Sequence, residues 1–376
     1  DEVRTISGVC KVAAILAPQG GRLLPMGEAH AGQTAALAGL SARPGERIGD
    51  GFGLEAPETV PLMSVQVEPT APLTQSALLA HLREMEEEDP LLSVRPEADG
   101  VSVGVMGAVQ VEVLQGILAA RFGDVVRMCP PHVLYRETIA APVVGIGHYE
   151  PLRHYAEVWL KLEPGAPGSG ISFAADCPPN SLEENWQRLI RTHVFERAHP
   201  GVLTGSPLCD VRIRLIAGRA HLKHTEGGDF REATCRAIRN ALMQAENVLL
   251  EPVVRFELAM PNEALARVTG ELLRIGAQLD ASETDGGETT LTGRCTAAMF
   301  WDYPTRFAAS THGHGRIASR FDRYEPCKNQ DDIVRQSGYD PLADTLNPPG
   351  SVFCSHGAGF YVAWDHVREW AHCEVE

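Results

Sequence analysis

The sequence predicts an α+β protein built from several domains, and three observations lead to this prediction. The chain has 376 residues, more than one hydrophobic core usually organises, which favours two to four domains. Hydrophobic residues make up 44% of the chain and charged residues 22%, a composition typical of folded globular proteins rather than disordered chains. Short β-rich segments alternate with amphipathic helical segments, and one order of elements occurs twice.

Residues 1–57 consist of short β-rich segments separated by Gly and Pro turns. The segments lie at 9–15, 21–24 and 33–40, and residues 47–57 form a connector. Short strands bounded by turn residues are typical of barrels. We therefore predict that 1–57 is the remnant of a β-barrel.

Residues 58–133 show a cleaner pattern. The expected elements are a strand at 62–68, a helix at 74–88, strands at 91–95 and 101–105 joined by a turn at Asp99-Gly100, a helix at 109–121 and a strand at 125–128. This βαββαβ order is that of the ferredoxin-like sandwich, in which two helices cover one face of a sheet.

The same order returns in residues 252–325. The expected elements are a strand at 253–260, a helix at 262–275, hairpin strands at 278–283 and 288–293, a helix at 297–309 weakened by Pro304, and a strand at 316–324. Two ferredoxin-like domains therefore flank the middle of the chain.

The middle, 134–251, is predicted to be an elongated α+β domain. Strands are expected at 155–162, 171–175 and 208–217. Ser181-Leu182-Glu183-Glu184 reads as a capping box that opens a helix, and Asp229 with Glu232 as a second one. The remaining segment, 326–376, carries a short helix after Asn329 and an aromatic stretch at 351–370. It is too apolar for a free tail, so we expect it to dock on the last domain.

Charge and cysteine content narrow the possible functions. The net charge is −16, which argues against a protein that coats nucleic acid by bulk attraction but permits RNA contact through local basic loops. The nine Cys include no CxxC pair, which indicates reduced thiols in a cytoplasmic protein. No apolar run approaches the roughly 20 residues that cross a bilayer, so we expect no membrane contact.

Six short motifs occur in a fixed order along the chain. They are EEDP at 87–90, VMG at 105–107, VEV at 111–113, YRETI at 135–139, LLEP at 249–252 and THGHGR at 311–316. In this order and at these distances they resemble the C-terminal domains of elongation factor G, a translational GTPase. The resemblance implies that 1–57 ends the family's second domain and that 58–133, 134–251 and 252–325 are its third, fourth and fifth domains. Residues beyond about 325 lie outside it.

Within this family the chain is closer to the tetracycline ribosomal-protection proteins than to the housekeeping factor. The housekeeping factor has a Gly-rich stretch ahead of the first strand of its fourth domain, whereas residues 147–154 here read GHYEPLRH. The resemblance implies that the tip of the fourth domain enters the decoding centre of the small ribosomal subunit. One departure is the tip loop at 220–224, AHLKH, which lacks the aromatic and proline residues of the protection proteins.

The candidate contact residues are cationic and aromatic side chains in predicted loops. Two clusters would meet at the tip if the domain folds as in the family: His148, Tyr149, Arg153 and His154, and Arg219, His221, Lys223 and His224. A third cluster, His312, His314 and Arg316, would contact RNA of the large subunit. Lys and Arg would bind phosphates, and His or Tyr would stack on unpaired bases. The alternative is that these are solvated loops with ordinary charges.

No enzymatic centre is predicted in these residues. The phosphate-binding signature GxxxxGK[ST] does not occur, so we expect this chain alone not to hydrolyse GTP. We predict no catalytic, cofactor-binding or metal residues; His312-Gly313-His314 lacks a third ligand. The sequence opens Asp1-Glu2-Val3-Arg4 without Met. We therefore expect it to belong to a longer, ribosome-stimulated GTPase whose missing N-terminal domain binds GTP and Mg²⁺.

The leading hypothesis is a monomeric ribosome-binding region that contacts the RNA of both subunits and inserts its tip domain at the decoding centre, as in tetracycline resistance. Three alternatives stay open. The first is a stand-alone ribosome-binding adaptor without GTPase activity, and the second is a divergent elongation factor G paralogue that acts in translocation. The third is an unrelated enzyme built on ferredoxin-like domains, which would need convergent titratable groups that the sequence does not show.

Overall fold

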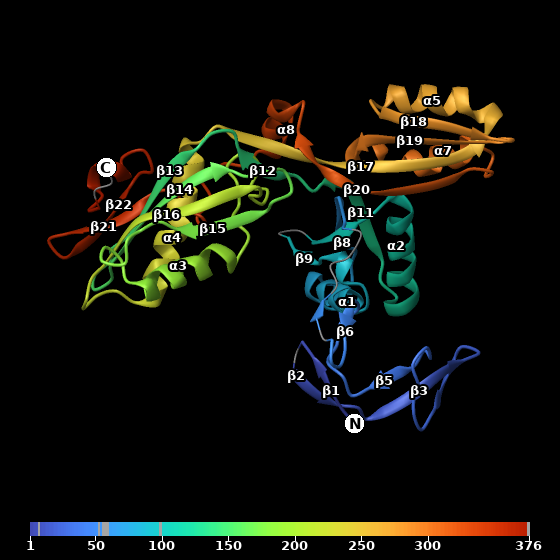
Figure 1. Ribbon diagram of the computed structural model, residues 1–376, viewed down its shortest axis with the longest axis horizontal. Coiled ribbons are helices and arrows are strands. Elements are labelled where there is room, and N and C mark those ends of the chain that lie inside the picture. Colours follow the sequence, from blue (N-terminus) through green and yellow to red (C-terminus); the bar gives the residue numbers. More distant parts are fainter. Residues whose placement is uncertain (7, 52, 55–59, 98–99, 374–376) are drawn as a thin grey trace. The chain divides into compact units, whose positions relative to one another are not determined.

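The computed structural model confirms a mixed α+β protein with several sheets (Figure 1). It describes residues 1–6, 8–51, 53–54, 60–97 and 100–373. These residues form two compact units, Asp1–His132 with Trp301–Pro304, and Val133–Phe300 with Thr305–Glu376. No helix in the described ranges has the length and apolarity needed to cross a bilayer.

The first residues of the chain form small separate sheets. Their strands are β1 (Glu2–Thr5) with β2 (Gly8–Lys11), β3 (Ala14–Gln19) between β4 (Arg22–Pro25) and β5 (Ala36–Ala38), and β6 (Glu46–Arg47) with β7 (Gly53–Leu54). Val9, Leu23 and Leu24 stay exposed on these strands. Over the described part of 1–57, the strands therefore bury little apolar surface of their own.

A four-stranded sheet with two helices follows. Its elements are β8 (Met63–Pro69), α1 (Gln75–Glu88), β9 (Arg95–Pro96), β10 (Val101–Val105), α2 (Ala108–Phe122) and β11 (Val126–Val133). The strand order β11-β8-β10-β9 is that of the ferredoxin-like sandwich, as predicted. Thr74 caps α1 by accepting a hydrogen bond from the N–H of Ala77.

The strand predicted at 91–95 is wrong except for its last residue, because β9 begins only at Arg95. Residues 90–92 form a 3-10 turn, η1 (Pro90–Leu92), instead of the first part of a strand at 91–95. The carboxylate of Asp89 accepts the Leu91 N–H at 3.1 Å, and Pro90 has no N–H to give to a sheet. The predicted hairpin turn at Asp99-Gly100 lies partly outside the described residues, because Asp99 is not described.

The second ferredoxin-like sheet has the same order. Its elements are β17 (Asn247–Pro261), η2 (Asn262–Ala264), α5 (Leu265–Arg274), β18 (Gln278–Asp285), β19 (Glu288–Thr296), α6 (Ala297–Phe300), α7 (Tyr303–Ser310) and β20 (Arg316–Pro326). β20 and β19 flank β17, and β12 (Arg136–Ile139) pairs with the start of β17. The single helix predicted at 297–309 is two helices. Pro304 is the second residue of α7, where a missing N–H is tolerated.

Two helices of the middle domain cover one face of its sheet. Its elements are β13 (Val143–Tyr149), β14 (Ala156–Pro164), β15 (Ile171–Ala175), α3 (Glu184–Phe195), β16 (Val211–Ala220) and α4 (Gly227–Gln244). β14 lies between β13 and β16, and α3 is the crossover that joins the parallel strands β15 and β16. β13 continues to Tyr149, so His148 and Tyr149 lie in a strand and not in the loop that the sequence suggested.

Both predicted capping boxes of this domain need correction. Ser181 is not the N-cap of α3, because it lies in a turn where its N–H donates to the Pro178 carbonyl. The N-cap is Glu183, whose side chain makes no capping hydrogen bond. α4 begins earlier than predicted, with Glu226 as its N-cap. Asp229 is the third helical residue, and its carboxylate accepts the Glu226 N–H at 2.8 Å.

The C-terminal segment does not dock on the last domain as predicted; most of it covers the middle sheet. β21 (Ser351–Ser355) pairs in parallel with β13 at Tyr149 and Val352, and β22 (Ala358–Val362) completes the edge (Figure 1). α9 (Val367–Trp370) covers the face opposite α4. β13 would otherwise leave an unpaired edge, with Ile146 and Trp159 uncovered beside it. Within the described part of this segment, α8 (Gln330–Ser337) lies beside β17, where Gln330 Oε1 accepts the Leu249 N–H.

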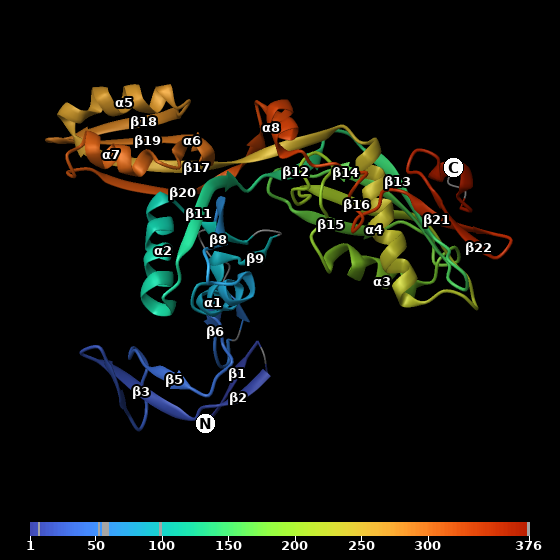
Figure 2. The ribbon, with the colours of Figure 1, turned by 180° about the vertical axis from the view of Figure 1, so that it is seen from behind.

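Helix α4 lies against the sheet (Figure 2), and two glycines of β13 allow the close approach. A Cβ at Gly147 would lie 1.8 Å from the carbonyl oxygen of Ala233, and one at Gly145 would lie 2.0 Å from that of Ala237. Because the atoms that would clash belong to the helix backbone, no side-chain rotation relieves the overlap. The helix axis therefore lies closer to β13 than any strand with Cβ atoms at these positions would allow.

We expect Gly147→Ala to lower the free energy of unfolding by about 3 kcal/mol, the upper end of the overpacking range, because α4 must move off the strand. Gly270→Ala is the matched control, since Gly270 lies in α5 with open space around its Cα. That change should raise stability by about 0.5–1 kcal/mol. Urea denaturation of both variants checks this, and equal stabilities would contradict the close packing of α4.

Candidate functional site

Three connections of the middle domain meet at one end of its sheet, which we call the tip. They are the β13–β14 turn (150–155), the β16–α4 loop (221–226) and the β21–β22 hairpin (355–358). The hydroxyl of Thr225 donates to the Tyr155 carbonyl at 2.6 Å, and His154 Nδ1 lies 2.8 Å from Asp229 Oδ1. The Glu150 N–H donates to the Val352 carbonyl at 2.8 Å. These bonds join the β16–α4 loop, and the strand β21 that leads into the hairpin, to the β13–β14 turn.

The β16–α4 loop is held in one shape by its own backbone. The His221 N–H donates to Thr225 Oγ1 at 2.6 Å, and the His221 carbonyl accepts the N–H groups of His224 and Thr225. The imidazoles of His221 and His224 stack, with ring centroids 4.6 Å apart. Leu222 between them is 101% exposed. The loop therefore presents two stacked rings and an uncovered apolar side chain to solvent.

The structure brings five of the predicted contact residues together at the tip: Arg153, His154, His221, Lys223 and His224. Arg153 adopts a left-handed backbone (φ 66°) in the β13–β14 turn, and its side chain is exposed. Within the described part of the chain, neither Arg153 nor Lys223 forms an ion pair. Both cations are therefore available to an external anion.

Two more predicted residues lie beside the tip with other contacts. Arg219 is exposed on β16, and one of its N–H groups lies 3.4 Å from the His372 carbonyl. Tyr149 is half-buried at the end of β13 under the guanidinium of Arg236, 5.7 Å from the ring centroid. Burial raises the pKa of Tyr149. The exposed Arg219 therefore fits the predicted contact with RNA better than the half-buried Tyr149 does.

The prediction that His148 contacts RNA is wrong. Its side chain is completely buried and cannot stack on a base from this position. It lies on the face of β13 opposite α4, where its ring stacks on Phe353 with centroids 4.1 Å apart. Nδ1 lies 2.8 Å from Glu157 Oε2, and Nε2 lies 3.1 Å from Glu150 Oε2. The sequence prediction placed it in a loop because the C-terminal strand that covers it is remote in sequence.

Glu157 is the centre of this buried group, and the sequence analysis missed it. Its carboxylate accepts four hydrogen bonds, from His148 Nδ1, Trp159 Nε1 and the backbone N–H groups of His372 and Cys373. Burial would raise the pKa of Glu157, but these bonds outweigh it and lower the pKa to about 2. The sequence signal was weak: Glu157 stands between the apolar residues Ala156 and Val158, in a strand that also carries Lys161 and Glu163.

His312, His314 and Arg316 form a separate group in the last domain. They lie between α7 and β20, in a turn where Thr311 Oγ1 accepts the Gly315 N–H at 3.2 Å. His312 has a left-handed backbone (φ 52°), and the side chains of His312 and His314 are both exposed. Arg316 forms an ion pair with Glu288 across the strands. Of these three side chains, those of His312 and His314 therefore remain available to an external partner.

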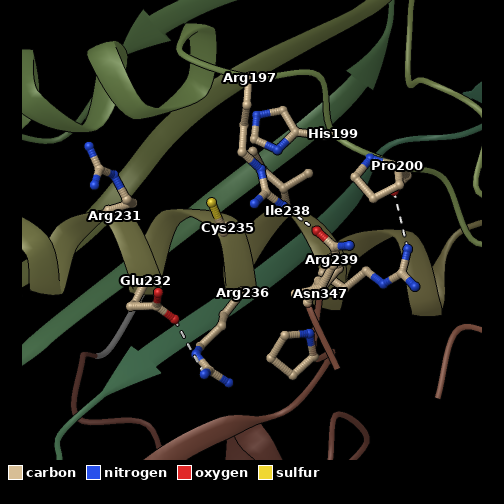
Figure 3. A pocket seen from close by; sticks show the side chains of 12 residues that line it. Arg197, His199, Pro200, Arg231, Glu232, Cys235, Arg236, Ile238, Arg239 and Asn347 are labelled. Atoms are coloured by element: carbon tan, nitrogen blue, oxygen red, sulfur yellow. Dashed lines mark hydrogen bonds and ion pairs between the residues drawn. The ribbon is translucent and has the colours of Figure 1, made fainter. Parts of the chain in front are cut away.

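A cavity beside α4 is lined by four arginines that sequence analysis did not single out as a group: Arg197, Arg231, Arg236 and Arg239. Figure 3 shows Arg231, Arg236 and Arg239 pointing in different directions. Arg236 donates to the Gly350 carbonyl at 2.9 Å, and Arg239 to the Gly201 carbonyl at 2.7 Å and the Tyr339 hydroxyl. Arg236 and Arg239 therefore hold the C-terminal segment on α4 and do not converge on a shared anion position.

His199 lies in the wall of this cavity, and its burial should make the free energy of unfolding depend on pH. Burial lowers the pKa of His199 below its ordinary value near 6.5, and its Nε2 hydrogen-bonds to the Val194 carbonyl at 2.9 Å. The unfolded chain therefore takes up the proton first as pH falls, and stability is lost below about pH 6.5 by about 1.4 kcal/mol for each unit that separates the two pKa values.

His199→Gln should flatten the fall in unfolding free energy between pH 7.5 and 5, measured by denaturant titration at each pH. His314→Gln replaces an exposed histidine and should keep the wild-type dependence. Identical pH profiles for wild type and His199→Gln would contradict the role of His199.

Comparison with known proteins assigns the two domains that carry these features. Residues 131–246 match the family model described as Elongation factor G, domain IV, and residues 248–333 match that described as Elongation factor G C-terminus. The crystal structure of a Thermus thermophilus protein is similar with a TM-score of 0.62 at 24% identity, over 90% of this chain and 53% of that one. The chain thus spans about half the length of that protein, and the likeness supports the fold. The chain therefore contains the fourth and the C-terminal domain of the elongation factor G family.

Proposed function

We propose that this chain is the ribosome-binding part of a translational GTPase and that its tip contacts ribosomal RNA. The observation that carries the proposal is the exposed tip, with unpaired Arg153 and Lys223 and the stacked His221–His224 pair, on a domain that matches domain IV of elongation factor G. The match to the elongation factor G domains supports ribosome interaction in general. The exposed residues of the tip are those that we expect to make the contact.

The chemistry of the tip suits single-stranded RNA. Arg153, Arg219 and Lys223 would bind phosphates, while the exposed imidazole of His221 or His224 would stack on an unpaired base. The net charge of −16 gives no overall attraction to RNA. Because salt screens charges beyond about 8–10 Å, a compact cationic tip still acts locally.

The rest of the proposal follows from the same family relation. His312 and His314 would form a second contact with RNA of the large subunit. GTP and Mg²⁺ would be bound by a domain outside these 376 residues, and this chain alone would not hydrolyse GTP. The protein would work in the cytoplasm as a monomer.

Ribosomal protection against tetracycline is the finer form of this proposal. It would require the β16–α4 loop to reach the drug site. That loop offers the fully exposed Leu222 between two imidazoles in place of tyrosine and proline side chains. Action as a divergent translocation factor, or as an adaptor without GTPase activity, is distinguished by the second experiment below.

Reversing the tip charges tests the RNA contact. The double variant Arg153→Glu, Lys223→Glu should weaken binding to purified ribosomes at least about tenfold and reduce the salt dependence of binding, because two phosphate contacts are lost. Arg335→Glu, on the exposed surface of α8, should bind like wild type. Co-sedimentation at several salt concentrations measures both effects. Equal weakening by all substitutions, or by none, would contradict a specific role for the tip.

GTP hydrolysis tests the wider proposal. The full-length protein should hydrolyse GTP faster with ribosomes than without them, and the 376-residue chain should be inactive in both conditions. Translation in vitro with tetracycline then separates the finer functions, since protection predicts relief by the full-length protein and a translocation factor predicts none. A full-length protein that ribosomes do not stimulate would favour the adaptor.

A further inference from the structure

We infer that His148, Glu150 and His372 form a binding site for a divalent transition-metal ion, Zn²⁺ above all, which ties the C-terminal segment to the middle sheet. The three side chains offer two imidazole nitrogens and a carboxylate oxygen, all within 4.8 Å of one another. The site borders the tip but uses none of the cations described there. The inference is independent of the proposed function.

The fold assembles these ligands from distant parts of the chain. His148 lies in β13 and Glu150 is the first residue of the turn that follows, and their side chains meet at 3.1 Å. His372 follows α9, and its backbone N–H donates to Glu157 Oε2 at 2.8 Å. The C-terminal segment thereby supplies a ligand that completes a pair already present on the sheet.

The hydrogen bonds around His148 favour metal ligation. The Glu157 carboxylate, 2.8 Å from Nδ1, holds the proton on that nitrogen and leaves Nε2 with its lone pair toward Glu150. Nε2 lies 3.1 Å from Glu150 Oε2, a separation that either a proton on Nε2 or a metal ion held by both atoms accounts for. Carboxylate, histidine and metal in this order form a common arrangement around protein-bound zinc.

His372 is oriented in a similar way. The Tyr155 hydroxyl lies 3.0 Å from its Nδ1, and the rings of His148 and His372 meet edge to face with centroids 4.8 Å apart. Zinc bonds of about 2.0–2.2 Å in a tetrahedron place ligand atoms about 3.3–3.5 Å apart. Because Glu150 is partly buried and His372 is exposed, their side chains can make the closure that this requires, which is at most about 1.5 Å.

The donor set points to the kind of ion. Imidazole nitrogen suits Zn²⁺, Cu²⁺ and Ni²⁺, whereas Mg²⁺ and Ca²⁺ prefer sets made of oxygen atoms. Two histidines and one carboxylate leave a fourth position for water. The bound ion would join β13 to the last residues of the chain, so metal binding and docking of the C-terminal segment would stabilise each other.

Metal titration of the 376-residue chain tests the site, with Co²⁺ as a spectroscopic probe and Zn²⁺ as competitor. Wild type should bind one equivalent of Co²⁺ with visible d–d absorption bands, and Zn²⁺ should displace it. His372→Ala and Glu150→Gln should each weaken binding by at least about 100-fold, since loss of outer-shell partners alone costs about 10–100-fold. His366→Ala removes an exposed histidine of the same segment and should bind like wild type.

Hydrogen exchange adds a readout that does not depend on the spectrum. Zn²⁺ should slow amide exchange across residues 351–373 in wild type and leave it unchanged in His372→Ala, whose fold is verified by circular dichroism. Absence of binding by wild type would show that a proton, not a metal, bridges His148 and Glu150. Equal binding by wild type and His372→Ala would place the metal elsewhere, and either result overturns the inference.

Discussion

The buried carboxylate of Glu157 is the interaction on which the arrangement of the middle domain and the C-terminal segment depends. A fully buried charge is tolerated only when its oxygens are hydrogen-bonded. β13 and β14 supply His148 and Trp159, and the two remaining donors are the backbone N–H groups of His372 and Cys373. The sheet therefore satisfies this charge only when the end of the chain is in place.

The two faces of the middle sheet follow different packing rules. One face carries Gly145 and Gly147, and α4 approaches the strand backbone directly. The other face carries Ile146, His148 and Trp159, and it is closed by the C-terminal segment. α4 is itself held from the outside, because Arg236 and Arg239 bind carbonyls of residues 341–350 and 200–201. The tip is thus a short set of loops on a support that is packed on both sides.

This support explains how a protein of net charge −16 would offer the proposed local contact for RNA. The tip has few cations, and they attract an external anion only if they are held close together and form no ion pairs within the protein. The hydrogen bonds of Thr225 with His221 and Tyr155 join the β16–α4 loop to the β13–β14 turn, so Arg153 and Lys223 keep their spacing. A proposed metal at His148, Glu150 and His372 would act on the same support and not on the contact itself.

The sequence by itself determined the elements whose signals are local. The two βαββαβ domains, the helix cap at Thr74 and the exposed cations at 153 and 223 follow from periodicity, turn residues and charge within short windows. Only the tertiary structure decided that His148 is buried, that Glu157 is a hydrogen-bond centre and that the C-terminal segment lies on the middle sheet. The physical reason is that these features depend on pairing between residues about two hundred positions apart, and periodicity carries no information about which strand edge a remote segment will cover.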